Sequence, residues 1–498
     1  MAYSPSPRLL GELVSDVAGA RLARGKPSVV IRGITQDSRR VVPGDLFVAV
    51  PGFERNGLEF VPDALRRGAA AVAGESMPAD DVATVLVADA RHALADLSAA
   101  FFSHPSRDLP VVGVTGTDGK TSTTQLLSAI LEAHGLRTGW LTTINTRIGQ
   151  DVRPNAADHT TPEAPIVQRT LAEMRAAGLD VAIVETSSHA LSLDRVRGVD
   201  FDVGIYTNLS PEHINFHGSF EAYLAAKRLL FERLPAEGVA VLNADDSHSG
   251  QMRVATHARV LTYALDRPAD FTARDVHLSP RGTTFTVYPD GRQVETRLVG
   301  RFNVSNWLAA YAAASVFGAT VDDLLTASAT QLPVPGRMNL VDRGQPYAVI
   351  VDFAHTPQAL EKALDTVRSL MRGRVLLAFG LAGGRDDANR SIMGSLAARK
   401  SDFFVITMDD PGHEDPAVIA SQIALGASQA GGRFTIELDR RAAIRLLFAQ
   451  AHPGDAVLLA GKGHEQRMVV GDQKLPWNDS CAAAEVLADL GYSIQAVP

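Results

Sequence analysis

Residues 109–124 read Leu-Pro-Val-Val-Gly-Val-Thr-Gly-Thr-Asp-Gly-Lys-Thr-Ser-Thr-Thr, and this stretch decides the fold. It begins with a short apolar run, 111–114, which predicts a buried parallel strand. Two glycines, Gly116 and Gly119, then interrupt the run, and apolar residues recur at helical spacing until Gly135. A strand, a glycine-containing turn and a helix in this order are the context that makes a phosphate-binding loop credible.

The glycines let the backbone curve so that its N–H groups face an anion, and the helix N-terminus adds partial positive charge. Lys120 can reach the terminal phosphates, and the hydroxyl of Thr121 can bind Mg²⁺. The match is the shorter T-G-T-x-G-K-T form, and Asp118 places a carboxylate near the phosphates. A plain strand-to-helix turn with a solvent-facing lysine fits the context less well. The predicted ATP-binding residues here are Gly116, Thr117, Asp118, Gly119, Lys120, Thr121 and Ser122.

Composition limits the class of protein. The 498 residues are enough for about three domains. The net charge of −8, without a dense Lys/Arg run, argues against a nucleic-acid partner. A single cysteine, Cys481, excludes a disulfide framework and a cysteine-rich zinc site. No signal-peptide pattern and no apolar run of about 18 residues is visible, so we expect a cytoplasmic protein without a membrane span.

The order of predicted elements divides the chain into units at 1–105, 106–335 and 336–498. The first unit places a polar turn, 36–45, between two strands. The second is built around the phosphate loop. The third alternates strands and helices between 348 and 459, which predicts a second doubly wound parallel sheet. The chain is therefore predicted to be a three-domain α/β protein.

Several polar residues follow predicted strands in the second unit. Glu185 follows the predicted buried strand 180–184, at the edge where open α/β sheets bind ligands, so it can hold Mg²⁺ or simply be exposed. His213 and His217 are four residues apart, a spacing that by itself more often reflects packing. Lys227 lies among apolar residues, where a lysine usually extends its ammonium to solvent. Asn303 and Asn306 can contact a nucleotide or cap the following helix.

Taken together, these residues resemble the Mur ligases, which assemble the cell-wall peptide on a uridine-nucleotide-linked muramic acid. The matching segments are T-G-T-D-G-K-T (115–121), T-T-P (160–162), E-T-S-S-H-A-L (185–191), T-N-L-S-P-E-H (207–213), A-A-K-R-L-L-F (225–231), F-N-V-S-N (302–306), P-G-R-M (335–338), D-F-A-H-T-P (352–357) and A-G-K-G-H-E (460–465). The segment D-S-R-x-V-x-P-G-D-L-F (37–47) is similar, within the family, to the enzymes that add the third peptide residue.

The resemblance implies a fold and a reaction. An N-terminal α/β domain would bind the UDP-sugar, a central P-loop ATPase domain with a parallel sheet would bind ATP, and a C-terminal Rossmann-like domain would bring the amino acid. Family members transfer the ATP γ-phosphoryl group to the D-glutamate carboxylate of UDP-N-acetylmuramoyl-L-alanyl-D-glutamate. An amine then attacks the acyl phosphate, which leaves an amide, ADP and phosphate.

The resemblance also implies two Mg²⁺ ions, because a carboxylate that attacks a polyphosphate needs cations between them. Thr121 and Glu185 would hold one ion next to Lys120. His213 and a carbamylated Lys227 would hold the second. An ammonium would repel Mg²⁺, whereas a carbamate formed from CO₂ offers the oxygen ligand that a hard cation prefers.

Further site residues follow from the matching motifs. The UDP-muramyl-peptide would contact Ser38, Phe53, Glu54, Arg55, Thr160, Thr161, Ser187 and Arg195. The nucleotide site would also include Asn303, Asn306, Arg337, Asp352 and His355. Because two domains supply groups, we expect the C-terminal domain to close on binding and to keep water from the acyl phosphate. We expect a monomer.

The sequence departs from the family at the acceptor site. Members that use meso-diaminopimelate usually carry D-N-P-R, but residues 409–414 read Asp-Asp-Pro-Gly-His-Glu. Gly412 cannot pair with a distal carboxylate, whereas Asp409, Asp410 and Glu414 could attract a distal ammonium. We therefore favour L-lysine or L-ornithine over diaminopimelate, although His413 could substitute for the arginine. The predicted amino-acid site comprises Arg390, for the α-carboxylate, with Asp409, Asp410, Pro411, Gly412, Gly461 and Glu465.

Three alternatives remain. A folylpolyglutamate-synthetase-like ligase shares the ATP loop and the modified lysine, but it would leave the D-S-R segment unexplained. A Mur-like amidotransferase subunit typically carries a cysteine cluster that is absent from this sequence. A P-loop regulatory protein that uses ATP as a switch would not need ligands at Glu185, His213 and Lys227.

Overall fold

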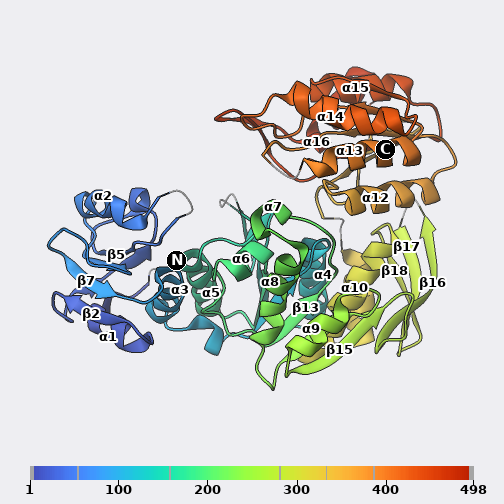
Figure 1. Cartoon of the computed structure of the whole chain (residues 1–498). Helices are drawn as coiled ribbons and strands as arrows, with labels where there is room; N and C mark the ends of the chain where they lie inside the picture. Colours follow the sequence, from blue (N-terminus) through green and yellow to red (C-terminus); the bar gives the residue numbers. More distant parts are fainter. Residues whose placement is uncertain are drawn as a thin grey trace.

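The computed structural model describes residues 5–52, 55–155, 159–279, 282–331, 334–384 and 387–492. The three main sheets follow one another along the chain, within 21–86, 111–296 and 339–460. Figure 1 shows the N-terminal part at one end, the central part beside it, and the C-terminal part stacked on the far half of the central part. No helix in the described ranges is long and apolar enough to cross a membrane.

The N-terminal domain is built on a five-stranded sheet in the order β2-β7-β6-β5-β4. Its strands are β2 (Arg21–Arg24), β4 (Gly33–Thr35), β5 (Asp45–Val48), β6 (Ala71–Gly74) and β7 (Ala83–Leu86), and β1 (Arg8–Leu9) pairs separately with β3 (Val30–Ile31). The helices are α1 (Leu10–Asp16), α2 (Val61–Arg66) and α3 (Ala90–Phe101), with short 3-10 turns at Ser38–Arg40, Gly57–Phe60 and Pro105–Arg107. Helix α3 packs against α5 (Ala164–Ala176) of the central domain, and ion pairs such as His92–Asp194 (3.0 Å) and Arg197–Asp96 (3.3 Å) also join the two domains.

The central domain contains an eleven-stranded sheet in the order β11-β10-β9-β12-β8-β13-β14-β15-β16-β17-β18. The strands from β9 to β16 in this order run parallel, and an antiparallel hairpin closes each end. The bounds are β8 (Val111–Thr115), β9 (Thr138–Leu141), β10 (Asn145–Ile148), β11 (Asp151–Pro154), β12 (Val181–Glu185), β13 (Val203–Tyr206), β14 (Val239–Asn243), β15 (Arg259–Ala264), β16 (Phe271–Ser279), β17 (Gly282–Tyr288) and β18 (Arg292–Thr296).

Helices cover both faces of the parallel part. One face packs on α4 (Lys120–Ala133), α10 (Arg301–Ala314) and α11 (Val321–Thr330), around the fully buried Trp307. The other face packs on α5 (Ala164–Ala176), α6 (Ser188–Ser192), α8 (Phe220–Glu232) and α9 (Ser249–Ala255). The single turns α7 (Ile214–His217) and Ser315–Phe317 complete the domain. The run 111–114 is thus a buried parallel strand at the centre of the sheet, as predicted.

The C-terminal domain has a six-stranded sheet in the order β19-β20-β24-β21-β22-β23. Its strands are β19 (Asn339–Leu340), β20 (Ala348–Asp352), β21 (Val375–Phe379), β22 (Phe403–Ile406), β23 (Phe434–Ile436) and β24 (Ala456–Ala460). Helices α12 (Pro357–Leu370), α13 (Ala388–Lys400) and α14 (Pro416–Gln429) cover one face, and α15 (Arg440–Gln450) and α16 (Asp479–Asp489) cover the other. This confirms the predicted doubly wound sheet.

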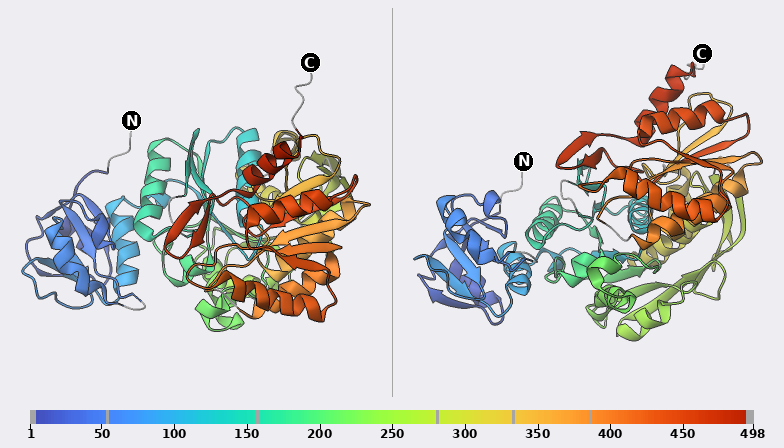
Figure 2. Two further views of the ribbon diagram at one scale, coloured as in Figure 1. Left: turned by 90° about the horizontal axis from the view of Figure 1, so that it is seen from above. Right: turned by 45° about the horizontal axis from the view of Figure 1, so that its top comes forward.

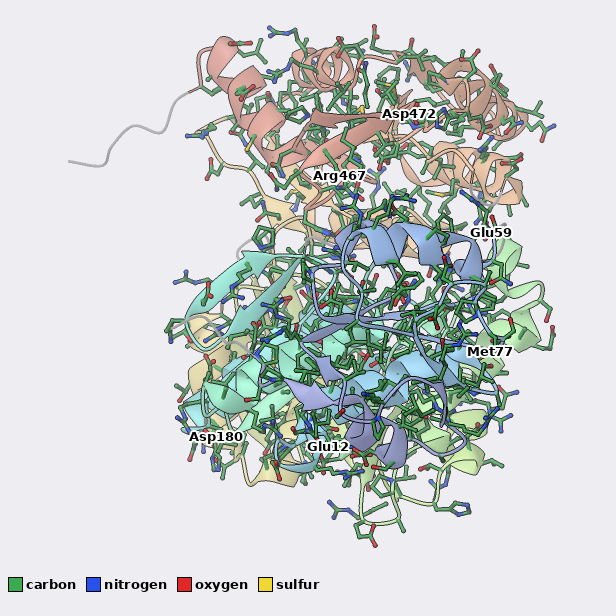
Figure 3. All side chains as sticks on the ribbon, turned by 90° about the vertical axis from the view of Figure 1, so that its left-hand side faces the viewer. Glu12, Glu59, Met77, Asp180, Arg467 and Asp472 are labelled. Carbon is green, nitrogen blue, oxygen red and sulfur yellow. The ribbon has the colours of Figure 1, made fainter. Side chains whose placement is uncertain are left out.

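The sequence did not predict the hairpin of β25 (Arg467–Val470) and β26 (Gln473–Pro476). Figure 3 places Arg467 on the side of the C-terminal domain that faces the central domain, and Asp472 farther away. Figure 2, viewed from above, shows the C-terminal domain covering part of the central domain while the N-terminal domain stands apart from it. The C-terminal domain therefore lies where its residues can border a site on the central domain.

Candidate active site

The phosphate loop follows β8 and leads directly into α4. Gly116 and Gly119 have φ of 148° and 85°, and a side chain at Gly116 would collide with the hydroxyl of Thr207. Asn208 holds the loop, because its carbonyl accepts from the backbone N–H of Thr117 (2.9 Å) and its amide oxygen from that of Asp118 (3.0 Å). The curvature expected from the glycines is therefore present and fixed by the neighbouring strand end.

The side-chain nitrogens of two lysines meet at this loop. Lys120 donates to the carbonyl oxygens of Gly116 (3.0 Å) and Thr117 (2.7 Å), and Lys227 of α8 also donates to that of Gly116 (2.7 Å). Lys227 is only 2% exposed and lies over the ring of Tyr223. Burial, followed by the charge of Lys120, holds the pKa of Lys227 well below its usual range. Lys227 does not extend to solvent, so that interpretation is wrong.

Glu185 is fully buried at the end of β12. One carboxylate oxygen accepts from the backbone N–H (2.7 Å) and the hydroxyl (2.6 Å) of Thr143. The other oxygen is buried and has no hydrogen-bond partner in the described part of the chain. A buried carboxylate oxygen without a partner is costly unless a cation or water satisfies it. The residue present therefore fits a metal ligand.

His213 lies beside a carboxylate that the sequence analysis did not select. Its ring nitrogen is 3.4 Å from Glu212, which also lies 3.3 Å from His355 of the C-terminal domain. Burial opposes the charge of Glu212, but the hydrogen bond with His355 and the charges of His213, His355 and Lys120 hold its pKa well below the usual range. The sequence could have indicated Glu212, because it directly precedes His213 in the matching segment 207–213.

Aromatic rings surround His213. The ring of His189 lies 4.6 Å from that of His213, 4.1 Å from that of Phe216 and 5.5 Å from that of His217. Burial, and next the charge of His213, lower the pKa of His189 to about 3. A neutral His189 can pack against these rings without adding charge to the site.

One cavity of 840 Å³ joins most of these groups. It is lined by Gly116, Thr117, Asp118, Gly119, Lys120, Thr121, Thr160, Ser187, Glu212, His213 and Lys227 from the central domain, among others. The C-terminal domain contributes His355, His464 and Glu465, and Arg337 of the preceding segment also lines it. Thr143, which holds Glu185, lies in the same wall. Of the residues predicted to surround the phosphoryl-transfer centre, Lys120, Thr121, His213 and Lys227 line this cavity, whereas Glu185 lies behind Thr143 and is not among the described lining residues.

Two predicted substrate contacts lie behind this wall. The hydroxyl of Thr161 donates to the carbonyl of Glu185 (2.7 Å). Arg195 is 7% exposed, pairs with Glu163 (2.8 Å) and donates to the carbonyl of Thr161 (3.1 Å). Neither is among the described residues that line the cavity. These hydrogen bonds hold the end of β12 in place, either directly (Thr161) or through Thr161 (Arg195).

Of the predicted UDP-binding residues, Ser38 and Arg55 belong to the N-terminal domain and do not line this cavity. Ser38 is buried, and Arg55 pairs with Glu59 (3.0 Å) and lies over the ring of Phe60. Phe53 and Glu54 fall outside the described residues.

A second cavity of 530 Å³ lies on the other side of the phosphate loop. Its polar lining includes Asp118, Gly119, Thr121, Ser122, Asn306, Arg337, Asp352, Lys362 and Asp365, and its apolar lining includes Leu265, Leu278 and Phe302. The carboxylate of Asp352 accepts from the backbone N–H groups of Met338 (2.7 Å) and Ala354 (2.9 Å), and burial raises its pKa. A polar end at the loop and an apolar end beyond it suit a nucleotide.

Two predicted nucleotide contacts are placed differently. Asn303 does not line this cavity; its amide donates to the carbonyl of Val299 (2.8 Å) and its oxygen accepts from Asn306 (3.3 Å). His355 instead lines the 840 Å³ cavity and a third cavity of 220 Å³. Asn303 thus positions Asn306, whose side-chain oxygen would collide with a Cβ at Gly119.

The third cavity, of 220 Å³, contains most of the predicted amino-acid site. Arg390, Asp409, Asp410, Gly461 and Glu465 line it, opposite Glu212, His213 and His355. Pro411 and Gly412 are not among its described lining residues. Gly412 has φ of 56°, and a Cβ there would meet no atom within 4 Å.

The charges of this cavity differ from the prediction in one respect. Glu414 pairs through both oxygens with Arg390 (2.5 and 2.8 Å) and is not among the described residues that line the cavity, so a cation already compensates its carboxylate. Arg390 also pairs with Asp387 (2.9 Å). His413 is exposed, pairs with Asp472 (3.2 Å) and is not among the described residues that line this cavity.

Lys462 was missed by the sequence analysis although it lies inside a matching motif. It is fully buried, 2.7 Å from Asp410, 2.5 Å from Glu465 and 3.6 Å from Asp409. Burial opposes its charge, but Asp409, Glu465 and Asp410 raise its pKa. These three carboxylates are spaced closely enough for a metal ion, but the ammonium of Lys462 already supplies the cation among them.

Comparison of this chain with known proteins agrees with its three-domain architecture. Three domain families match: "Mur ligase family, catalytic domain" at residues 30–102, "Mur ligase middle domain" at 114–314 and "Mur ligase, glutamate ligase domain" at 336–463. The chain is 44% identical over 486 residues to the UDP-N-acetylmuramyl-tripeptide synthetase of Roseiflexus sp. (strain RS-1), covering 93% of this chain and 95% of that protein. It is 40% identical over 477 residues to the UDP-N-acetylmuramoyl-L-alanyl-D-glutamate--2,6-diaminopimelate ligase of Geobacillus kaustophilus, covering 94% and 96%.

Solved structures agree. A UDP-N-acetylmuramoyl-L-alanyl-D-glutamate--2,6-diaminopimelate ligase matches with a TM-score of 0.67 and 29% identity, covering 98% of this chain and 100% of that one. The MurF ligase of Thermotoga maritima in complex with ADP shares the fold, with a TM-score of 0.64 and 18% identity over 92% and 96% of the chains. The chain therefore belongs to the Mur ligase family of ATP-dependent, ADP-forming amide ligases, and within that family it resembles the tripeptide synthetases of peptidoglycan precursor synthesis.

Proposed function

We propose that this ligase joins a diamino acid to the D-glutamate of UDP-N-acetylmuramoyl-L-alanyl-D-glutamate through an acyl phosphate. The supporting observation is that the three cavities adjoin in the order this reaction needs. The nucleotide cavity and the 840 Å³ cavity share Asp118, Gly119, Thr121 and Arg337. The 840 Å³ cavity and the acceptor cavity share Glu212, His213, Phe353, His355 and Glu465. A carboxylate in the middle could thus receive a phosphoryl group from one side and an amine from the other.

Two Mg²⁺ ions fit the donors that the chain offers. The unpartnered oxygen of Glu185 and the hydroxyl of Thr121 would hold one ion, and His213 with a carbamylated Lys227 would hold the other. When bound, the ions would neutralise the charge between the triphosphate and the attacking carboxylate. Lys120, now bonded to its own loop, would turn toward the phosphates.

Carbamylation of Lys227 is consistent with its surroundings. Only a neutral amine can attack CO₂, forming an N–C bond and releasing one proton. Burial and the charge of Lys120 lower the pKa of Lys227, which increases the share of that neutral form. The resulting anion would lie beside Lys120, which shares the Gly116 carbonyl with it.

For the acceptor we favour L-lysine or L-ornithine over meso-diaminopimelate. Among the described residues that line the acceptor cavity, the one guanidinium is that of Arg390, and it is already paired with Glu414 and Asp387. Gly412 adds no cation for a second carboxylate. The carboxylate of Glu465 and the backbone carbonyl at Gly461 would bind the α-amino group of the acceptor amino acid.

Phosphate release tests both levels of the proposal. The enzyme with ATP, Mg²⁺ and the UDP-muramyl-dipeptide should release phosphate only when a diamino acid is added, and fastest with lysine or ornithine. A highest rate with meso-diaminopimelate would overturn the acceptor preference alone. Phosphate release at the same rate without the UDP-muramyl-dipeptide would overturn the proposal that this compound is the substrate.

The UDP end has its own test. We propose that Ser38, Phe53, Glu54 and Arg55 contact the UDP part of the substrate. Ser38→Ala should raise KM for the UDP-muramyl-dipeptide severalfold and leave KM for ATP unchanged. An unchanged KM for the dipeptide substrate would remove Ser38 from the site. We also expect a monomer, which sedimentation equilibrium would check.

A further inference from the structure

The phosphate loop of this chain carries a negative charge where a triphosphate has to bind. Asp118 lies between the two loop glycines and lines both the nucleotide cavity and the 840 Å³ cavity. One of its carboxylate oxygens is buried and has no hydrogen-bond partner in the described part of the chain. A carboxylate next to phosphate oxygens repels them unless a cation lies close to both.

The carboxylate cannot easily turn away, because the backbone of Asp118 is fixed. Its N–H donates to the amide oxygen of Asn208 (3.0 Å). Its carbonyl accepts from the hydroxyl of Thr207 (2.7 Å) and the amide of Asn208 (3.1 Å). The charge therefore stays at the loop when the nucleotide enters.

A cation from another domain faces this charge. Lys362 of α12 lines the nucleotide cavity, and its ammonium is 4.0 Å from the unpartnered oxygen of Asp118. The neighbouring acid on the same face of α12, Asp365, is already neutralised by Lys400 (2.8 Å). Arg301, another cation of this cavity, pairs with Asp266 (2.7 Å). Lys362 is thus directed at Asp118, whereas these other charges are compensated elsewhere.

We infer that Lys362 is a nucleotide-binding residue supplied by the C-terminal domain, and that it offsets the Asp118 carboxylate so that the triphosphate can bind. This inference rests on the proposed nucleotide site. It also makes triphosphate affinity depend on the position of α12, because the compensating charge reaches the loop only when the C-terminal domain lies over it. Figure 1 shows α12 on the side of that domain that faces the central domain.

A double-mutant cycle on the full-length enzyme tests the inference. Calorimetry would measure binding of Mg²⁺ with the non-hydrolysable ATP analogue AMPPNP to wild type, Lys362→Gln, Asp118→Asn and the double variant. Lys362→Gln should weaken binding about tenfold, because it leaves Asp118 opposed to the phosphates. Asp118→Asn should bind as well as wild type or better. The double variant should return to within about threefold of wild type, because neither charge is then uncompensated.

The control is Arg368→Gln, which removes a positive charge from the same helix. Arg368 pairs with Asp402 (2.6 Å) and does not line the cavity, so this variant should bind the analogue normally. Lys362→Arg should retain most of the affinity. In turnover, Lys362→Gln should raise KM for ATP and leave kcat within about twofold, which a merely structural defect would not do.

The outcomes separate the inference from the proposed site. If the double variant binds as weakly as Lys362→Gln or more weakly, the two charges are independent and the inference is wrong. If Asp118→Asn alone weakens binding, Asp118 itself holds the metal ion, which also overturns it. If wild type does not bind the analogue at all, the proposed nucleotide site fails.

Discussion

Replacement of Lys227 by methionine should abolish activity without weakening the fold. Methionine has a similar length, and the Gly116 carbonyl that Lys227 contacts would keep its second donor, Lys120. The lost hydrogen bond therefore costs about 1 kcal/mol. The native lysine has a larger cost, because it must give up its proton to be buried. Burial and the charge of Lys120 hold the pKa of Lys227 well below its usual range, and each unit of such a shift corresponds to ~1.4 kcal/mol.

Methionine avoids that cost, so Lys227→Met should be at least as stable as wild type near neutral pH. The sign with pH follows from proton binding. The unfolded state binds a proton that the folded state does not, so wild-type stability rises as pH increases toward about 10 and then levels off. The methionine variant lacks this dependence. The stability difference should therefore shrink and reverse as pH rises, which urea unfolding at several pH values would measure.

Activity should respond in the opposite way. If the carbamate of Lys227 holds Mg²⁺, Lys227→Met should lower phosphate release by about 100-fold or more. Wild type incubated with ¹³C-bicarbonate should show a carbamate carbon signal that the variant lacks. A variant that is less stable by the same amount at every pH would show that Lys227 is charged in the fold, and the reasoning from its burial would be refuted.

Glu185→Gln keeps both hydrogen bonds from Thr143, so it should leave the melting temperature within a few degrees while lowering phosphate release by about 100-fold or more; full activity would exclude Glu185 as a metal ligand. Gly412→Arg should raise kcat/KM for meso-diaminopimelate relative to lysine, at a stability cost of about 1–2 kcal/mol for the positive φ; an unchanged ratio would separate position 412 from acceptor choice. The depressed pKa of Glu212 stabilises the fold above the unfolded-state pKa of about 4.3, and this stability is lost as pH falls through the lower folded-state pKa; His355→Ala should reduce that acid-side dependence in urea unfolding, and an unchanged pH profile would contradict it. Small-angle scattering should show a smaller radius of gyration with AMPPNP and the UDP-muramyl-dipeptide bound than without ligands, and unchanged dimensions would count against domain closure.

The parts of the site that the sequence predicted are those fixed by topology. In a parallel sheet the carboxyl ends of neighbouring strands meet at one edge, so β8, β12 and β13 bring the phosphate loop, Glu185 and the segment before His213 together. The same rule placed Asp409 and Gly461 in one cavity. A motif that follows a recognisable strand therefore carries its position in space with it.

The missed parts depend on which charges pair across elements. Lys462 and Glu212 stood inside matching motifs, but their partners, Asp410 and His355, lie 52 and 143 residues away. Glu414 was assigned to the cavity because of its place in the turn, yet Arg390 of α13 takes both its oxygens. Periodicity and strand order do not specify such pairings, because they follow from side-chain geometry after the helices have packed.

The position of the C-terminal domain also bears on how water is kept out of the site. An acyl phosphate must meet an amine before it meets water. The C-terminal domain supplies Lys362 to the nucleotide cavity, Arg337 and His355 reach the middle cavity from the join and from that domain, and Glu465 borders the acceptor cavity. A single displacement of this domain would therefore dismantle all three cavities together. On the proposed function, forming the phosphoryl-transfer centre would also form the amine pocket, which would couple activation of the carboxylate to the presence of its acceptor site.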